Sequence, residues 1–369
     1  MSKINKSYLG CVNPPIYQAS TVLFESLDEM KEVDNQYGRA GTETNFALER
    51  EVAELENGYK TIATPSGLAA IVSSILAFVR KGDHILVCDT VYGPTKLFCD
   101  KQLRRFGVEV SYYDATIGKE IESLVQDNTQ LIFLESPSSL LYEIQEIEEI
   151  VEVAKKRNLR TVIDSTWGAG YLFKALDFGI DVSVQSGSKY FSGHSDILFG
   201  TITAKVKEIY DVIWAEYYLL GYHTSPQDCY LAVRGLKTLD VRLEKHQKSA
   251  IEIAEFLESK DEIAQVIYPG LPSFKQHDRY KKYFSGANGL ISFVFKSEYS
   301  IEQIRNFVDS LQLFKLGYSW GGFESLAMIY ENLPGSYKKK VDMPLIRFHV
   351  GIENLDELKQ DIDNALTEI

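Results

Sequence analysis

Residues 160–190 read RTVIDSTWGAGYLFKALDFGIDVSVQSGSKY and contain two short apolar runs, at 160–163 and 182–185, each bounded by turn residues. Runs of this length and composition are typical of buried strands. The first run ends in Asp164, and the second continues into SGSKY, which includes Lys189. Because the carboxyl ends of parallel strands meet at one edge of a sheet, where open α/β folds bind ligands, the sequence predicts an acid and an amine in one crevice.

Strands and helices alternate around this stretch. Further short apolar runs occur at 84–88, 108–113, 131–135 and 200–204, and segments with helical periodicity at 66–80, 94–106 and 147–158. Such alternation predicts right-handed crossovers and a mostly parallel sheet that is covered on both faces. We therefore expect an α/β fold.

The chain divides into three expected parts. Residues 1–41 lack a regular pattern and are interpreted as an extended arm with one or two brief helices. Residues 42–235 form the α/β domain. From 236 to 369 the pattern changes to a smaller α+β domain, with a long helix over 236–259 and later elements at 290–295, 301–312 and 345–350. No linker separates the two domains, so we expect them to pack together.

The composition is that of an ordinary soluble globular protein, with 369 residues, 45% apolar and 25% charged residues and a net charge of −13. Disorder and a membrane span are therefore not expected. An acidic surface repels phosphodiester backbones, which argues against nucleic acid as a partner. The four cysteines form no CxxC pair and the N-terminal residues carry no apolar signal segment, which favours a reduced, cytoplasmic setting.

Several common motifs are absent. The sequence has neither GxGxxG nor a Walker A pattern, which argues against nicotinamide and P-loop chemistry. The six histidines lie far apart without HExxH or paired cysteine spacing, so no metal site is predicted.

One pattern points to a different enzyme class. Residues 317–321, GYSWG, match GxSxG, and Asp342 and His349 follow in the order found in α/β-hydrolases. The motif requires a helix that starts at the serine, whereas Gly321 and Gly322 follow at once and only about fifty residues remain. A serine hydrolase that uses Ser319 is kept as a remote alternative.

Residues 64–68, TPSGL, introduce an apolar helical segment with Ser66 as its expected N-cap. Free N–H groups and the positive end of the helix dipole would then face outward, ready for a phosphate. A phosphate cradle, an amine and a carboxylate are what a protein contributes to pyridoxal 5′-phosphate (PLP) chemistry, in which a lysine forms the Schiff base and an acid keeps the pyridine nitrogen protonated.

Three longer motifs resemble those of the Cys/Met-metabolism, or trans-sulfuration, enzymes: IDSTW at 163–167, SKYFSGHSD at 188–196 and LIRFHVG at 345–351. The resemblance covers nearly the whole chain and implies fold type I, with a mostly parallel seven-stranded sheet and a smaller α+β C-terminal domain. Within the family, YSWGG at 318–322 and YGRAGT at 37–42 resemble the bacterial cystathionine β-lyases.

The resemblance implies roles for individual residues around the cofactor. Lys189 matches the Schiff-base lysine, Asp164 the partner of the pyridine nitrogen, and Tyr92 the tyrosine stacked on the ring. The positions that match the phosphate cradle are Gly67, Leu68, Ser186 and Ser188. Tyr37 and Arg39 match a pair that reaches the phosphate of the neighbouring subunit's cofactor, so the family's site needs two chains.

The resemblance also implies a substrate side. Arg347 matches the arginine that holds the substrate α-carboxylate, a bidentate role that suits a guanidinium. The residues expected to line this side are Tyr318, Ser319 and Trp320. A homotetramer, built as a dimer of dimers, is the implied assembly.

The implied activity is PLP-dependent β-elimination of L-cystathionine to homocysteine, pyruvate and ammonia in methionine biosynthesis, with Lys189 as the proton carrier. Racemisation of alanine is an expected second activity, with Tyr92 or the partner subunit's Tyr37 supplying a proton. The main alternative is another member of the family: methionine or cystathionine γ-lyase, γ-synthase or cysteine desulfhydrase. A scaffold without activity is disfavoured because the full residue set is present.

Overall fold

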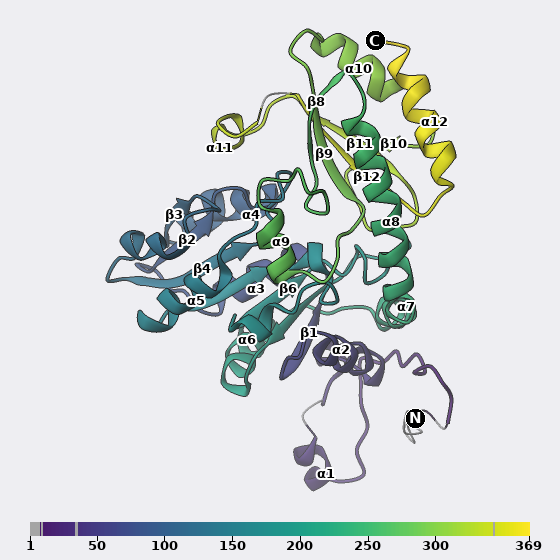
Figure 1. Cartoon of the computed structure of the whole chain (residues 1–369). Coiled ribbons are helices and arrows are strands. Elements are labelled where there is room, and N and C mark those ends of the chain that lie inside the picture. The colour runs from purple at the N-terminus through teal and green to yellow at the C-terminus, as the bar shows by residue number, and fades with distance from the viewer. Residues whose placement is uncertain (1–7, 9, 34–35, 342–343) are drawn as a thin grey trace.

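The computed structural model describes residues 8, 10–33, 36–341 and 344–369, so part of the predicted arm lies outside the described residues. Figure 1 shows a larger α/β unit, a smaller unit at one end of it and an N-terminal arm that extends from the opposite end. The arm contains a short helix α1 (Leu27–Glu32) and a 3₁₀ turn at Gly38–Ala40.

The larger unit is built on a seven-stranded sheet. In spatial order its strands are β1 (Lys60–Thr64), β7 (Gly200–Ala204), β6 (Val182–Gln185), β5 (Arg160–Asp164), β4 (Thr129–Glu135), β2 (His84–Cys88) and β3 (Glu109–Tyr113). The pairs from β6 to β3 are parallel, whereas β7 runs opposite to both of its neighbours. Most of these strands are buried along nearly their whole length, which explains their continuous apolar runs.

Helices cover both faces of this sheet (Figure 1). They are α2 (Glu43–Leu55), α3 (Gly67–Leu76), α4 (Gly93–Phe98), α5 (Ile147–Lys156), α6 (Lys207–Leu219) and α7 (Pro226–Leu236). Short 3₁₀ turns lie at Gly118–Leu124, Thr166–Gly168 and Ala175–Phe178, and a π turn at Cys99–Leu103. Helix α3 packs on β6 and β7, which sets its N-terminus beside the segment that follows β6.

The smaller unit has a five-stranded sheet. Its strands are, in spatial order, β10 (Lys315–Leu316), β11 (Leu326–Tyr330), β12 (Leu345–His349), β9 (Leu290–Phe295) and β8 (Ile263–Ile267). Its helices are α8 (Leu239–Glu258), α9 (His277–Tyr283), α10 (Ile301–Ser310), α11 (Gly335–Lys338) and α12 (Leu355–Leu366). Helix α8 runs from α7 along the small sheet (Figure 1).

The two units share one continuous apolar core. Trp167 of the larger unit packs edge-on against Phe284 of the smaller one, with ring centroids 5.3 Å apart. Its carbonyl accepts a hydrogen bond of 2.8 Å from the Asn288 side chain. The elements of the smaller unit that carry predicted site residues are therefore held firmly against the larger sheet.

The predicted fold class, α/β with a mostly parallel seven-stranded sheet and a smaller α+β part, is confirmed. Two predicted helices differ in detail. The segment at 94–106 is α4 followed by the π turn, and the helix predicted from 236 begins at Leu239. The chain turns after α7 because the Arg242 guanidinium binds the Gly235 carbonyl at 2.7 Å, which closes the end of α7. Strand β1 has no counterpart in the predicted strands.

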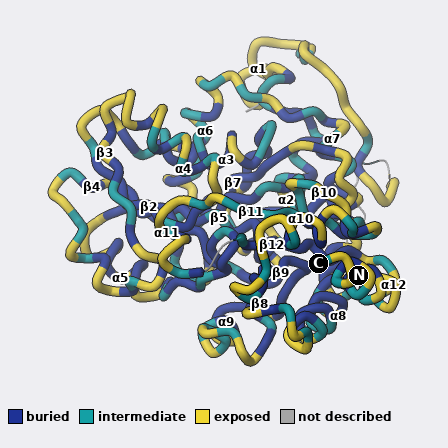
Figure 2. The backbone as a smooth tube through the Cα atoms, turned by 90° about the horizontal axis from the view of Figure 1, so that it is seen from above, coloured by how far each residue is buried: buried dark blue, intermediate teal, exposed yellow. Residues whose placement is uncertain are grey.

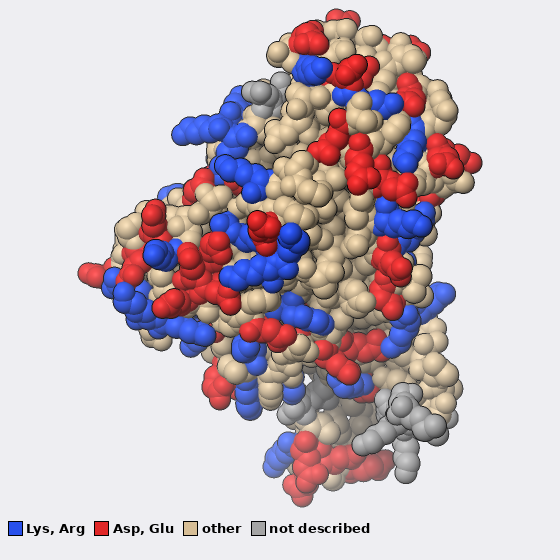
Figure 3. All heavy atoms as spheres, in the orientation of Figure 1, with Lys and Arg blue, Asp and Glu red and all other residues tan. Residues whose placement is uncertain are grey.

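The surface differs between the arm and the body. Figure 2 shows the arm around α1 mostly exposed, whereas the central strands of the large sheet are buried. The arm exposes large apolar side chains, including Val12 (93%), Leu23 (89%) and Leu27 (74%). On the face drawn in Figure 3, acidic and basic residues are interspersed over the body.

A buried carboxyl group joins the end of α2 to the sheet. Glu56, which is 2% exposed, accepts hydrogen bonds from the Ser183 hydroxyl at 2.6 Å and the Gln185 amide at 2.8 Å, and a third from the Thr203 hydroxyl. Burial raises the pKa of Glu56, and these donors oppose the rise. Strands β6 and β7 are thereby fixed just before the segment that carries Lys189.

We predict that Glu56→Ala lowers the free energy of unfolding by about 3 kcal/mol, because three buried donors lose their acceptor. Urea denaturation measures this loss. The matched control is Glu51→Ala, which breaks a partly exposed 2.6 Å ion pair with Lys237 and should cost no more than about 1 kcal/mol. Equal losses in the two variants would contradict the role given to Glu56.

Candidate functional site

The site begins at the carboxyl edge of β5 and β6. These strands are parallel neighbours, and Asp164, the last residue of β5, is in register with Val184 of β6. Lys189 follows β6 by four residues. The Asp164 carboxylate raises the pKa of Lys189 and is itself affected by the lysine, so the two groups lie within electrostatic reach, as the strand ends predict.

Asp164 is held by a local turn. Its Oδ1 accepts hydrogen bonds from the Thr166 N–H at 3.0 Å and from the Thr166 hydroxyl at 2.5 Å. Burial is the largest influence and raises the pKa of Asp164, whereas these hydrogen bonds lower it. Oδ2 takes no part in these contacts and is left for another donor.

Lys189 is held from the side of the smaller unit. Its Nζ donates to the Ser319 hydroxyl at 2.9 Å and lies 5.5 Å from the centroid of the Trp320 ring. Burial, followed by the positive charge of Arg347, lowers the pKa of Lys189 to about 8. The amine is therefore far more available as a base near neutral pH than an ordinary lysine.

Arg347 lies on β12 and is 7% exposed. Its Nη2 donates to the backbone carbonyls of Gly317 (3.4 Å), Tyr318 (2.9 Å) and Ser319 (3.2 Å). Its buried Nε has no partner among the described residues. The carbonyls that hold the Arg347 guanidinium are neutral, and its Nε–H is an unused donor. The guanidinium is therefore suited to bind an anionic group.

Tyr92 lies at the start of α4, and its side chain is 47% exposed. Its backbone N–H donates to Glu135 Oε2 at 2.7 Å. Burial raises the pKa of the Tyr92 phenol, and the nearby Asp164 and Glu135 carboxyl groups raise it further. The tyrosine therefore belongs to the same electrostatic environment as Asp164.

The residues of the predicted phosphate cradle lie where α3 meets the segment after β6. Ser66 caps α3 by accepting from the Ala69 N–H at 3.1 Å, as predicted. A Cβ added to Gly67 would lie 2.6 Å from the Ser186 Cβ, so only glycine allows the two segments to approach so closely. Leu68 is 38% exposed beside them. The Ser188 hydroxyl donates to the Phe199 carbonyl and accepts from its N–H.

Tyr37 and Arg39 lie on the arm rather than beside Lys189. The Arg39 guanidinium is 4.3 Å from the centroid of the Tyr218 ring and donates to the Tyr218 carbonyl at 3.2 Å, which places it against α6. It also lies 6.0 Å from the centroid of the Tyr37 ring. Among the described residues, Arg39 makes its contacts with Tyr37, Tyr218 and His223 rather than with Asp164 or Lys189 of the same chain.

The geometry at Ser319 differs from that of a serine hydrolase. The Ser319 hydroxyl is bonded to Lys189, while His349 Nε2 receives the Gly321 N–H at 3.0 Å. No helix begins at Ser319 in the described chain. Asp342, the third residue of that pattern, lies outside the described residues. The nucleophile and base that the remote alternative requires are therefore not paired.

Three further residues of this environment were not singled out by the sequence. Glu135 ends β4 beside Asp164, and burial together with the Asp164 charge raises its pKa well above the usual range. The sequence carried a signal for Glu135, because it lies at the end of a predicted strand, as Asp164 does. The Asp-x-Thr spacing was the available signal for Thr166. The ring of Tyr330, 5.9 Å from the Arg347 guanidinium, had no signal because β11 was not predicted.

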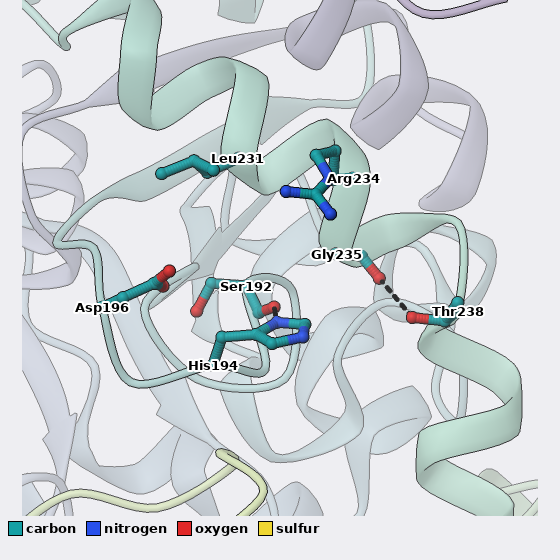
Figure 4. Close-up of a pocket in the computed structure, with 7 residues that line it drawn as sticks. All are labelled: Ser192, His194, Asp196, Leu231, Arg234, Gly235 and Thr238. Atoms are coloured by element: carbon teal, nitrogen blue, oxygen red, sulfur yellow. Dashed lines mark hydrogen bonds between the residues drawn. The ribbon is translucent and has the colours of Figure 1, made fainter.

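A separate cavity of about 220 Å³ lies between residues 192–196 and α7 (Figure 4). It is lined by Ser192, His194, Asp196, Leu231, Arg234, Gly235 and Thr238. His194 Nδ1 bonds to the Ser192 carbonyl at 2.6 Å, and Asp196 and Arg234 lie on opposite sides. None of the residues predicted to take part in chemistry lines it.

Two further points concern metal ions and membranes. Within the described residues, no cluster of three or more His, Cys, Asp or Glu side chains is arranged to hold a metal ion. Of the described helices, none combines the length and the apolar character that crossing a membrane requires.

Comparison with known proteins shows the family of this chain. Residues 2–367 match the family described as Cys/Met metabolism PLP-dependent enzyme. A cystathionine β-lyase of Haemophilus influenzae is 41% identical over 374 residues, covering 98% of this chain and 94% of that protein. An L-alanine/L-glutamate racemase of Wolbachia pipientis is 37% identical over 381 residues, with coverages of 98% and 94%.

A solved structure has the same fold as this chain. The crystal structure of cystathionine γ-synthase from Xanthomonas oryzae pv. oryzae, in complex with aminoacrylate and cysteine, has a TM-score of 0.91 and 31% sequence identity. The match covers 97% of this chain and 94% of that one. The chain therefore belongs to the Cys/Met metabolism family of PLP-dependent enzymes.

Proposed function

We propose that the protein is a PLP-dependent carbon–sulfur lyase that cleaves L-cystathionine by β-elimination, giving homocysteine, pyruvate and ammonia in methionine biosynthesis. The observation that carries this proposal is the joint placement of Asp164, Lys189 and Arg347 around Ser319 and Trp320. A relative of that name shares 41% of its residues over nearly the whole chain.

The residues present fit the cofactor. The free Asp164 Oδ2 would hold the pyridine nitrogen, and the exposed Tyr92 ring offers a stacking surface. The phosphate would lie at the N-terminus of α3, between Gly67 and Ser186, with Leu68 and Ser188 beside it. Lys189 would hold the cofactor covalently through Nζ. When bound, PLP accepts the electron pair that proton removal leaves at the substrate α-carbon.

Arg347 would bind the substrate α-carboxylate with the donors that its three carbonyl contacts leave available. Tyr318, which is 80% exposed, and Trp320 would flank the side chain of the substrate. A carboxylate fixed in this way brings the α-carbon within reach of Lys189, because Ser319 contacts both groups, Arg347 through its carbonyl and the lysine through its hydroxyl.

Lys189 Nζ would remove the proton from the α-carbon and deliver it to the leaving sulfur as the Cβ–S bond breaks. The hydrogen bond from Nζ to Ser319 orients the amine for both transfers. Water completes the reaction by releasing the remaining three-carbon unit as pyruvate and ammonia. The low pKa of Lys189 allows its Nζ to act as a base near neutral pH.

The pKa of Lys189 predicts how cofactor-free protein takes up PLP. The unprotonated amine is the reactive form, so the rate of uptake should rise with pH through about 8 and then level off, whereas an ordinary lysine would keep accelerating to beyond pH 10. Stopped-flow absorbance after adding PLP measures the rate. In Arg347→Gln the midpoint should move to higher pH, because the charge that lowers the pKa is removed. A midpoint above pH 10 in the unmodified protein would contradict this.

Product analysis tests the proposed reaction. With L-cystathionine the enzyme should release pyruvate and homocysteine, and Lys189→Ala should reduce turnover to background because the proton carrier is lost. Lys281→Ala, which alters an exposed lysine paired with Asp278, is the control and should keep parental activity. Release of 2-oxobutyrate and cysteine would instead support the γ-eliminating alternative in the family.

A second candidate activity is racemisation of alanine. It is favoured by the relative named L-alanine/L-glutamate racemase and by the Tyr92 phenol, which lies close enough to Asp164 and Arg347 to be influenced by both charges. Tyr92, or Tyr37 of the partner subunit, would return the α-proton on the face opposite Lys189.

For this second activity, incubation with L-alanine should yield D-alanine, measured by chiral chromatography. Tyr92→Phe should reduce that yield more than it reduces pyruvate formation from cystathionine, because the phenol is needed only for the second proton transfer. No D-alanine above background would rule the activity out.

The assembly and setting are part of the proposal. We take residues 1–41 as an arm whose Tyr37 and Arg39 reach the partner's cofactor, with 42–235 and 236–369 as the two domains of a cytoplasmic homotetramer, a dimer of dimers. The exposed apolar side chains of the arm support an interface there. Sedimentation of the purified protein measures the assembly directly.

A further inference from the structure

Strand β12 holds residues 317–322, which we call the substrate loop, through two side chains. Arg347 binds the carbonyls at 317–319, and His349 Nε2 lies 3.0 Å from the Gly321 N–H. Side chains two residues apart on a strand point to the same face, so both act on the loop from one side. The substrate loop is thereby attached to β12 at both ends.

His349 holds two consecutive residues of the substrate loop. Its Nε2 lies 3.0 Å from the Gly321 N–H and 3.1 Å from the Gly322 carbonyl, so it accepts from Gly321 in one tautomer and donates to Gly322 in the other. His349 is fully buried, and burial together with the neighbouring His246 lowers its pKa well below the usual range. The ring therefore stays neutral, and in either tautomer its Nε2 is bonded to the loop backbone.

A second buried histidine, His246, lies beside His349. His246 of α8 bonds through Nδ1 to the Val350 carbonyl at 2.8 Å, so its Nε2 is an acceptor. The rings of His246 and His349 have centroids 5.2 Å apart. His349 Nδ1 and His246 Nε2 have no hydrogen-bond partner among the described residues. His246 therefore supports His349 through the packing of the two buried rings.

Gly321 connects this pair to the lysine. A Cβ on Gly321 would lie 3.0 Å from Lys189 Cα and 2.8 Å from Tyr190 N, and the residue has φ +85°, so glycine alone is accommodated there. Two residues earlier, the Ser319 hydroxyl accepts from Lys189 Nζ. The position of the Gly321 backbone therefore sets where Ser319 and Trp320 lie relative to the amine.

We propose that His349, supported by His246, is a positioning residue for the reaction: it fixes the backbone at Gly321 and Gly322 so that Ser319 and Trp320 remain in contact with Lys189. His349 touches neither substrate nor cofactor and acts through the substrate loop. The effect on turnover rests on the proposed lyase function, whereas the effect on the loop does not.

Two amide variants form a matched test. A glutamine side chain can reach the place of the histidine Nε2, whereas an asparagine reaches only that of Nδ1. In His349→Asn, hydrogen–deuterium exchange of the peptide covering residues 317–325 should accelerate about tenfold in the purified protein as isolated, because the backbone at Gly321 and Gly322 loses its partner on β12. The value of kcat/KM for cystathionine should fall between about tenfold and a hundredfold through misplacement of the loop.

Three comparisons separate positioning from general damage. His349→Gln should recover most of the loop protection and of kcat/KM. The amount of PLP bound per chain should be unchanged in both variants, because Asp164 and the phosphate cradle are not altered. His277→Asn, which alters a histidine bonded to the Pro269 carbonyl outside the site, should leave loop exchange and kcat/KM at parental values.

Parental loop exchange in His349→Asn, or equal damage in the Asn and Gln variants, would overturn the proposal. If His349→Asn does not fold, His246→Asn is the test instead, because it keeps a donor for Val350 and removes only Nε2. Faster exchange at 317–325 in that variant supports the role of the two histidines. Unchanged exchange refutes it. If the unmodified enzyme does not cleave cystathionine, the proposed function fails, and the exchange data still decide the role of His349.

Discussion

The parallel pairing of β5 with β6 is the constraint on which the site depends. It brings the end of each strand to the same edge of the sheet, so Asp164 and the segment that carries Lys189 leave the sheet side by side. Helix α3 packs on β6 and β7 and brings Gly67 against Ser186 at the same edge. An acid, an amine and a helix N-terminus are thereby collected without any contribution from the surface loops. Glu56, bonded to the side chains of β6 and β7, secures these strands up to Gln185, the last residue of β6.

The smaller unit completes the site through β12. Side chains alternate along this strand, so one set packs in the core of the smaller unit and the other set binds the substrate loop. Ile346 and Phe348 are fully buried, and Phe348 stacks on Phe314 with ring centroids 4.2 Å apart. Arg347 and His349 alternate with them and bind the substrate loop. The apolar core of the small sheet therefore fixes the distance between Arg347 and Lys189, and the two units must pack together for either residue to be in place.

Buried polar groups at this edge are tolerated because each is partly satisfied. Thr166 binds one oxygen of Asp164, the Tyr92 N–H binds Glu135, and three carbonyls bind Arg347. What remains is a carboxylate oxygen, an amine with a depressed pKa and a guanidinium donor, all in an environment with little water. Asp164 therefore favours a ligand group that donates a hydrogen bond and Arg347 favours an anionic group, while the unprotonated amine of Lys189 can react with a carbonyl carbon.

The sequence alone determined the α/β class, the positions along the chain of six of the seven strands of the large sheet, the capped start of α3 and the strand-end placement of Asp164 and Lys189. These follow from local pattern, because buried strands and helix caps leave direct signals in a short window. The resemblance added Tyr92 and Arg347, which no local pattern distinguishes from a core tyrosine or a surface arginine. Glu135 and Thr166 left local signals of the same kind, a strand end and an Asp-x-Thr spacing. Only the tertiary structure decided that Ser319 faces Lys189 rather than His349 and that Gly321 rests on the backbone of the lysine. These two contacts join the smaller unit to the larger one, so they are set by the packing of the two units against each other rather than by neighbouring residues in the chain.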